Sequence, residues 1–90
     1  MKIDREIEVI NKLGLHARAA AQLVKLATAY SSDVRLVRGT QSVDAKNIMG
    51  VMMLAAACGT RITVSVEGED ADEAIDRISI LFSDRFGEQE

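Results

Sequence analysis

The alternation of hydrophobic and polar residues predicts where strands form, because a strand with one buried face has a period of two residues. Residues 61–67 alternate most cleanly, and residues 3–9 follow the same pattern except where Arg5 interrupts the apolar side. Residues 34–38 and 41–44 lie on either side of a Gly-Thr turn and are predicted to pair as a hairpin. The pattern therefore predicts four strands.

Three further segments carry hydrophobic residues at helical spacing. The clearest is the alanine-rich stretch 17–30, since alanine also has the highest intrinsic helix propensity. A short helix is predicted over 48–56, with the Asn47 side chain capping its first amides. The last helix is predicted over 71–83, with acidic residues at its positive N-terminal end. The predicted core positions of the short helix are Ile48, Val51 and Leu54.

The predicted order is strand, helix, strand, strand, helix, strand, helix. Strands with one polar side favour an antiparallel sheet with one solvated face, and the amphipathic helices would cover the other face. A length of 90 residues without repeats or linkers predicts a single α+β domain over residues 1–90. The last three residues, 88–90, are expected to be frayed.

Composition narrows the classes of partner. The chain has three aromatic residues and a formal net charge of -3, with no dense run of Lys or Arg, so nucleic-acid binding is not expected. No signal peptide or long apolar span is apparent, which favours a cytoplasmic protein that does not insert into a membrane. The single cysteine, Cys58, has no partner for an internal disulfide and is expected to be a small buried hydrophobic residue.

The candidate chemistry centres on His16, the only histidine, which immediately precedes the alanine-rich helix. A helix N-terminus offers unpaired N–H groups and partial positive charge, both of which favour a phosphate dianion. Arg18 adds a planar donor group, and Gly14 permits a sharp turn before the site. The residues alone also fit a plain surface histidine and a solvated arginine. One histidine cannot build a zinc site, so neither a metal nor a cofactor is predicted.

Three segments resemble the histidine-containing phosphocarrier (HPr) family. Residues 11–20, Asn-Lys-Leu-Gly-Leu-His-Ala-Arg-Ala-Ala, are similar to its active-site motif, in which a glycine and a hydrophobic residue precede His-Ala-Arg-Pro-Ala. Residues 45–54, Ala-Lys-Asn-Ile-Met-Gly-Val-Met-Met-Leu, resemble its second signature, Lys-Ser-Ile-Met-Gly-Val-Met. Residues 62–70 resemble its last strand and the following turn. The three segments occur in family order and together span nearly the whole chain.

The resemblance implies an open-faced β-sandwich, in which three helices cover one face of a four-stranded antiparallel sheet. It implies that enzyme I of the phosphoenolpyruvate-dependent phosphotransferase system phosphorylates His16 on Nδ1. The phosphoryl group then passes to a histidine or cysteine of an enzyme II component of the A type. The phosphate ligands implied are Arg18 and the backbone amides of Ala17 and Arg18.

Two positions depart from the family pattern. Ala19 stands where the family usually has proline, so the helix entry loses the stiffening of a fixed φ angle. Asn47 stands where many members carry a regulatory serine. Asparagine can cap a helix but cannot be phosphorylated, so regulation by a kinase at this position is not expected.

The resemblance also places a docking surface beside the histidine. Met49 and Met52 would form its apolar centre, since methionine is flexible and adapts to several partners. The same methionines also fit ordinary core packing. Lys46 and Asn47 belong to the same surface, and Lys25 could help steer acidic partners. A monomer is expected.

Several functions remain open from the sequence. The leading one is a phosphocarrier for sugar uptake. A regulatory carrier of the nitrogen-related branch, called NPr, has the same chemistry and is compatible with Ala19 and Asn47. A non-phosphorylated interaction module is disfavoured because both His16 and Arg18 are present. An enzyme with its own substrate is disfavoured because no second catalytic constellation is found.

Overall fold

The computed structural model describes residues 1–90 and contains the predicted elements in the predicted order. One short 3-10 helix after the last α-helix was not predicted. The elements are β1 (Lys2–Glu8), α1 (Ala17–Thr28), β2 (Asp33–Arg38), β3 (Gln41–Asp44), α2 (Ile48–Met53), β4 (Arg61–Glu67), α3 (Ala71–Ser83) and η1 (Arg85–Gly87).

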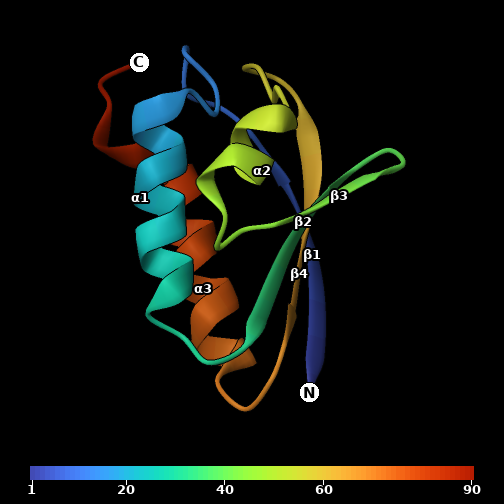
Figure 1. Ribbon diagram of the computed structural model, residues 1–90. Coiled ribbons are helices and arrows are strands. Elements are labelled where there is room, and N and C mark those ends of the chain that lie inside the picture. The colour runs from blue at the N-terminus through green and yellow to red at the C-terminus, as the bar shows by residue number, and fades with distance from the viewer.

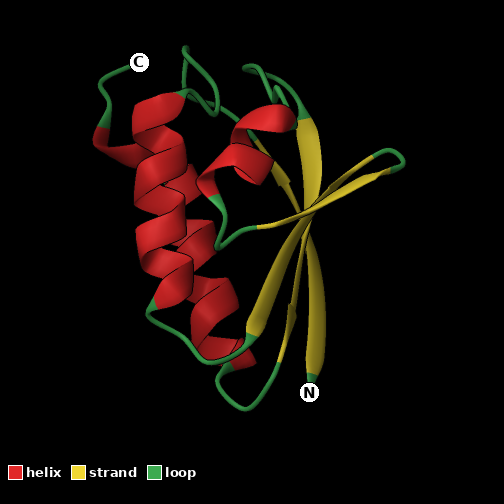
Figure 2. Cartoon of the chain, viewed as in Figure 1, coloured by secondary structure: helices red, strands yellow, loops and turns green.

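The four strands form one antiparallel sheet in the order β1-β4-β2-β3. All three α-helices lie on one face of this sheet, and the other face is open (Figures 1 and 2). The predicted open-faced β-sandwich is therefore confirmed. The alternation in β4 explains the arrangement, because Ile62, Val64 and Val66 are buried beneath the helices while the residues between them are not.

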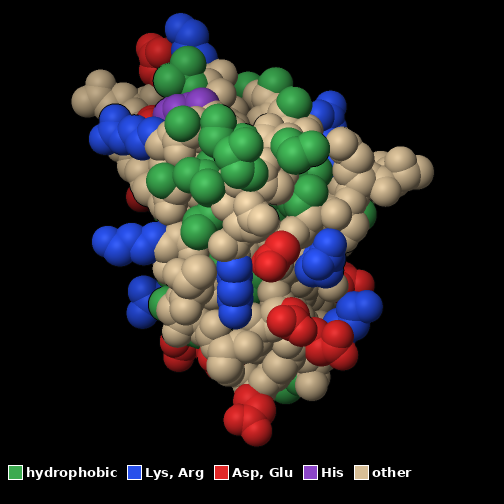
Figure 3. Space-filling model, in the orientation of Figure 1, with side chains coloured by type: hydrophobic (Ala, Val, Ile, Leu, Met, Phe, Trp, Pro, Cys, Tyr) green, Lys and Arg blue, Asp and Glu red, His purple; other side chains and the backbone are tan.

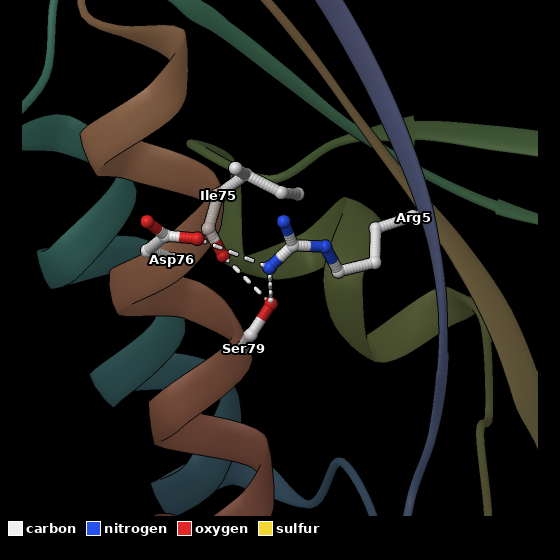
Figure 4. A network of polar contacts seen from close by, with 4 residues as sticks. All are labelled: Arg5, Ile75, Asp76 and Ser79. Atoms are coloured by element: carbon white, nitrogen blue, oxygen red, sulfur yellow. Dashed lines mark hydrogen bonds and ion pairs between the residues drawn. The ribbon is translucent and has the colours of Figure 1, made fainter.

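Arg5, the residue that interrupts the apolar side of β1, has a defined role at the edge of the sheet. Its Nη1 donates to Asp76 Oδ1 at 3.2 Å and to Ser79 Oγ at 2.9 Å, both on α3 (Figure 4). The Ser79 hydroxyl in turn donates to the Ile75 carbonyl at 2.7 Å. Because β1 is an edge strand, an inward-pointing charge there also opposes pairing with a foreign strand.

The predicted helix ends were too far along the chain. The helix expected over 17–30 ends at Thr28, and the one expected over 48–56 ends at Met53. Ala55 follows the short helix with φ at +50°, in the left-handed region, which stops the helical path.

Two predicted core residues are exposed instead. Ile48 is 38% exposed, because it opens α2 at the rim of the core while Val51 and Leu54 provide the buried stripe. Cys58 is also exposed, so the prediction that it is buried was wrong. After α2 the chain buries Ala56 and then turns outward at Cys58 and Gly59, which leaves the thiol on the surface.

Asp70, the residue before α3, ties this helix to the loop between α1 and β2. Its carboxylate accepts hydrogen bonds from the backbone amides of Ser31 and Ser32, at 2.9 and 3.0 Å, and from both serine hydroxyls. The hydrogen bonds from Ser32 and Ser31 lower the pKa of the Asp70 carboxyl to about 2. The ionised carboxylate therefore stabilises the fold.

We expect Asp70→Asn to lower the melting temperature by several degrees near neutral pH. A carboxyl whose pKa is depressed from 3.8 to about 2 contributes its full stability above 3.8 and loses it as the pH falls through 2. Thermal melts at a series of pH values should therefore show the two proteins converging in acid. Asp72→Asn is the control, since Asp72 is an exposed acid of the same helix. Coincident melting curves near neutral pH would contradict this role of Asp70.

Candidate functional site

His16 occupies the N-cap position of α1 in an extended conformation, with φ at -74° and ψ at 178°. Its backbone carbonyl accepts the first helical hydrogen bond, from the Ala20 amide at 2.8 Å. Its side chain makes no capping hydrogen bond, and the first turn contains no acidic residue. The amides of Ala17 and Arg18 therefore lack helical partners and remain available to an anion.

The loop before His16 is fixed by contacts to a second loop. Gly14 has φ at +65°, and the Leu15 amide donates to the Ala56 carbonyl at 2.9 Å. Asn11 is fully buried, and its Nδ2 donates to the Gly14 carbonyl at 2.8 Å. This network, which also buries Leu15, determines where the helix starts and where the His16 ring lies.

The His16 ring contacts the C-terminal segment of the chain. Its Nε2 lies 2.6 Å from Glu88 Oε2, and the two side chains are only 29% and 13% exposed. The other Glu88 oxygen accepts from Asn11 Nδ2 at 3.1 Å. The hydrogen bond from His16, followed by that from Asn11, lowers the pKa of the Glu88 carboxyl. Glu88 is therefore a carboxylate directed at the histidine.

The prediction that residues 88–90 are frayed was thus wrong. The Lys12 amide donates to the Glu90 carbonyl at 2.7 Å, and the Lys12 ammonium lies 3.4 Å from Glu90 Oε2. In Figure 1 the C-terminus, in red, lies near the start of α1. Sequence reasoning missed Glu88 and Asn11, since neither lies in a periodic segment or a charge cluster that would single it out.

The other predicted phosphate ligand, Arg18, projects from the first turn of α1. Its side chain is exposed, and none of the hydrogen bonds or ion pairs of the protein involves its guanidinium. The chain enters α1 directly at Ala17 although Ala19 replaces the family proline. Ala19 itself is fully buried, so its methyl group packs in the core.

A surface of exposed hydrophobic residues lies beside the histidine. Figure 3 shows hydrophobic side chains in green gathered next to the purple histidine. Met49, Met52 and Met53 are 66%, 41% and 69% exposed, which rules out core packing as their main role. We call this the methionine surface. Its members are the exposed hydrophobic residues of α2, namely Ile48, Met49, Met52 and Met53.

Asn47 and Lys46 flank this surface and have structural bonds of their own. The Asn47 side chain accepts from the Met49 and Gly50 amides at 3.0 and 3.2 Å, which confirms that it caps α2. Lys46 is half-buried, and its ammonium donates to the Tyr30 carbonyl at 2.9 Å. Lys46 therefore fastens the C-terminal end of α1 as well as contributing positive charge.

No group of three or more His, Cys, Asp and Glu side chains converges in a way that could hold a metal ion. None of the helices has both the length and the apolar character needed to cross a membrane.

Residues 3–84 match the PTS-HPr family, described as the PTS HPr component phosphorylation site. The chain belongs to the HPr family. Phosphocarrier protein HPr of Cupriavidus necator is 50% identical over 88 residues, which cover 98% of this chain and 99% of the relative. The crystal structure of HPr-C-His from Thermoanaerobacter tengcongensis has a TM-score of 0.94 at 40% identity, covering 98% of this chain and 99% of that one.

Membership in the HPr family makes the chain a phosphocarrier of the phosphotransferase system. The NPr of Shewanella violacea is 39% identical over 87 residues, covering 97% of this chain and 96% of the relative. This identity is below the 50% shared with the HPr of Cupriavidus necator, so the comparison does not favour the nitrogen-branch alternative.

Proposed function

We propose that His16 accepts a phosphoryl group from enzyme I and passes it to an A-type enzyme II component during sugar uptake. The main support for this proposal is the uncapped N-terminus of α1, where the amides of Ala17 and Arg18 are free next to the imidazole. These amides and the Arg18 guanidinium bind the phosphoryl oxygens. The working unit is the single domain of residues 1–90, acting as a cytoplasmic monomer without cofactor or metal.

The charges at this site suit a carrier that must also release its cargo. A helix N-terminus favours an anion by about 0.3–1 kcal/mol at a surface, and one hydrogen bond to a charged group adds about 1.5–3 kcal/mol. These contributions stabilise phosphohistidine but are small enough that the phosphoryl group can still be transferred onward. The Arg18 side chain is exposed, so a phosphoryl group bound by its guanidinium can be reached by a partner from solvent.

The partners dock on the methionine surface in this proposal. Met49 and Met52 supply a small apolar contact, and transient complexes have small interfaces that release quickly. Lys46 and Asn47 form its polar border, where positive charge favours acidic partner surfaces. The position of this surface next to the histidine brings a docked partner to the phosphoryl group.

The test is incubation of the chain with enzyme I and phosphoenolpyruvate, followed by mass spectrometry of the intact and digested protein. We expect one phosphoryl group per chain, located on His16. The label should be lost in acid, because protonation of the ring nitrogen weakens the phosphorus–nitrogen bond. A stable label on any other residue would contradict the proposal.

The docking surface has a separate test. We expect Met49→Asp to weaken binding to enzyme I by about tenfold or more, since a carboxylate in the apolar centre must be desolvated there. The Met49 side chain is 66% exposed in the free protein, so stability should change by no more than about 0.5 kcal/mol. A binding titration and a melting curve measure the two effects.

Ile80→Asp is the matched control, because Ile80 is 60% exposed but lies on α3. It introduces the same charge and should leave the affinity for enzyme I unchanged. If both variants weaken binding equally, added negative charge explains the loss and Met49 has no special part in docking. If neither does, the partner surface lies elsewhere.

A further inference from the structure

The hydrogen bond between His16 and Glu88 of the C-terminal segment has no part in the phosphate binding proposed at the start of α1. We propose that Glu88 is a positioning residue, which holds the proton of His16 on Nε2 and thereby presents Nδ1 as the nucleophile. This inference deepens the proposed function and rests on His16 being the phosphoryl acceptor. It concerns a residue outside the histidine-arginine motif.

The geometry fixes which ring nitrogen carries the proton. Glu88 is ionised, because hydrogen bonds from His16 and Asn11 lower its pKa, and a carboxylate can only accept. At 2.6 Å from Glu88 Oε2, Nε2 must therefore be the donor. In the neutral imidazole, the lone pair then lies on Nδ1. In the same way, a hydrogen bond to a second residue fixes the tautomer and orientation of histidines that serve as metal ligands or bases.

The C-terminal segment is held firmly enough to orient a side chain. Phe86 is buried, and its ring meets that of Phe82 edge-to-face at 4.9 Å and 66°. Arg85 and Phe86 have φ at +54° and +55°, a conformation that non-glycine residues keep only where the surroundings enforce it. These two residues turn the chain back after α3, and the Lys12 amide then binds the Glu90 carbonyl at 2.7 Å.

Glu88 itself is held by a second hydrogen bond. Asn11 Nδ2 donates both to Glu88 Oε1, at 3.1 Å, and to the Gly14 carbonyl, at 2.8 Å. Asn11 therefore connects Glu88 to the same loop that places His16. The carboxylate lies at Nε2, and the positive charge of Arg18 also helps to lower its pKa.

The carboxylate also suits the transfer steps. In the first step the Nδ1 lone pair attacks the phosphorus, the Nδ1–P bond forms and the bond from phosphorus to the donor breaks. Nε2 keeps its proton, so the ring becomes cationic and is stabilised by Glu88. When a nucleophile of the next protein attacks, the Nδ1–P bond breaks and its electron pair returns to Nδ1. No proton has to leave Nε2 in either direction.

The experiment compares Glu88→Gln, Glu88→Ala and Glu88→Asp with the wild-type chain. We expect the first two to slow phosphorylation by enzyme I roughly tenfold, the lower end of the effect of losing such an orienting partner. Nitrogen-15 NMR of the neutral ring should show a protonated Nε2 and a bare Nδ1 in the wild type, and a mixture of tautomers in both variants. Glu88→Asp, which keeps the carboxylate, should recover part of the rate.

Glu90→Gln is the control, because it keeps the backbone carbonyl that binds the Lys12 amide and removes only a solvent-exposed ion pair with the Lys12 ammonium. Its rate and ring spectrum should match the wild type. Unchanged rate and tautomer in Glu88→Gln and Glu88→Ala would overturn the proposal, and faster phosphorylation would overturn it by making the segment an obstacle. If His16 carries no label in the wild-type chain, the proposed function itself fails, and the ring spectra still decide whether Glu88 fixes the tautomer.

Discussion

Replacing His16 with alanine is expected to abolish phosphoryl acceptance completely. His16 is the only histidine of the chain, so no other imidazole can take the group. The free amides and Arg18 can bind phosphate, but they offer no nucleophilic lone pair. The loss should therefore be total under conditions in which the wild-type chain is fully labelled. Mass spectrometry after incubation with enzyme I and phosphoenolpyruvate measures it.

The fold should survive this change. The His16 side chain makes no capping hydrogen bond, so its loss removes only the contact with Glu88. We expect the melting temperature to fall by only a few degrees and binding to enzyme I to persist, because the methionine surface is untouched. Cys58→Ala is the control for an alternative acceptor, since Cys58 is an exposed thiol. It should be labelled as the wild type is. Label persisting in His16→Ala would rule out His16 as the acceptor.

The periodic parts of the fold could be predicted from the sequence because their signals are local. Buried residues recur at every second position in β4 and at every third or fourth position in α3. Both were predicted with the observed bounds, 61–67 and 71–83. Arg5 shows the limit of this reasoning, because its partners Asp76 and Ser79 are more than seventy residues away.

The errors have a common physical origin. Ile48 and Cys58 are exposed because the rim of the core lies where α2 begins and where its following loop turns, and hydrophobic type alone does not locate that rim. Residues 88–90 have no periodicity of their own. Their order comes from contacts distant in sequence, with Asn11, Lys12 and His16. Such contacts give no pattern along the chain.

The site itself was predictable in part. His16, with the amides of Ala17 and Arg18, forms a local motif of three consecutive residues, and a helix start is readable from sequence. The capping role of Asn47 was predicted for the same reason. Glu88 was not, because its proximity to His16 depends on how η1 turns the chain back over the start of α1.

Replacing Gly14 with alanine is expected to be the most damaging single-methyl change near the site. Gly14 has φ at +65°, which costs a residue with a Cβ about 1–2 kcal/mol. The added Cβ would also lie 2.5 Å from the Ala56 carbonyl oxygen and 2.9 Å from Ala57 Cα, which are backbone atoms that cannot rotate away. Such crowding adds about 1–3 kcal/mol. We expect a total loss of roughly 2–5 kcal/mol in the free energy of unfolding.

Gly39→Ala separates the two contributions, since Gly39 has φ at +58° but no atom within 4 Å of the added Cβ. It should lose only the conformational part, and urea unfolding of both variants measures the difference. The crowding in Gly14→Ala must also push the 11–15 loop away from Ala56, because Leu15 binds that same carbonyl. His16 moves with the loop, so phosphorylation should slow in Gly14→Ala and stay normal in Gly39→Ala. Equal stability losses in the two variants would show that the loop yields without strain, and the proposed coupling between the two loops and the His16 ring would then be wrong.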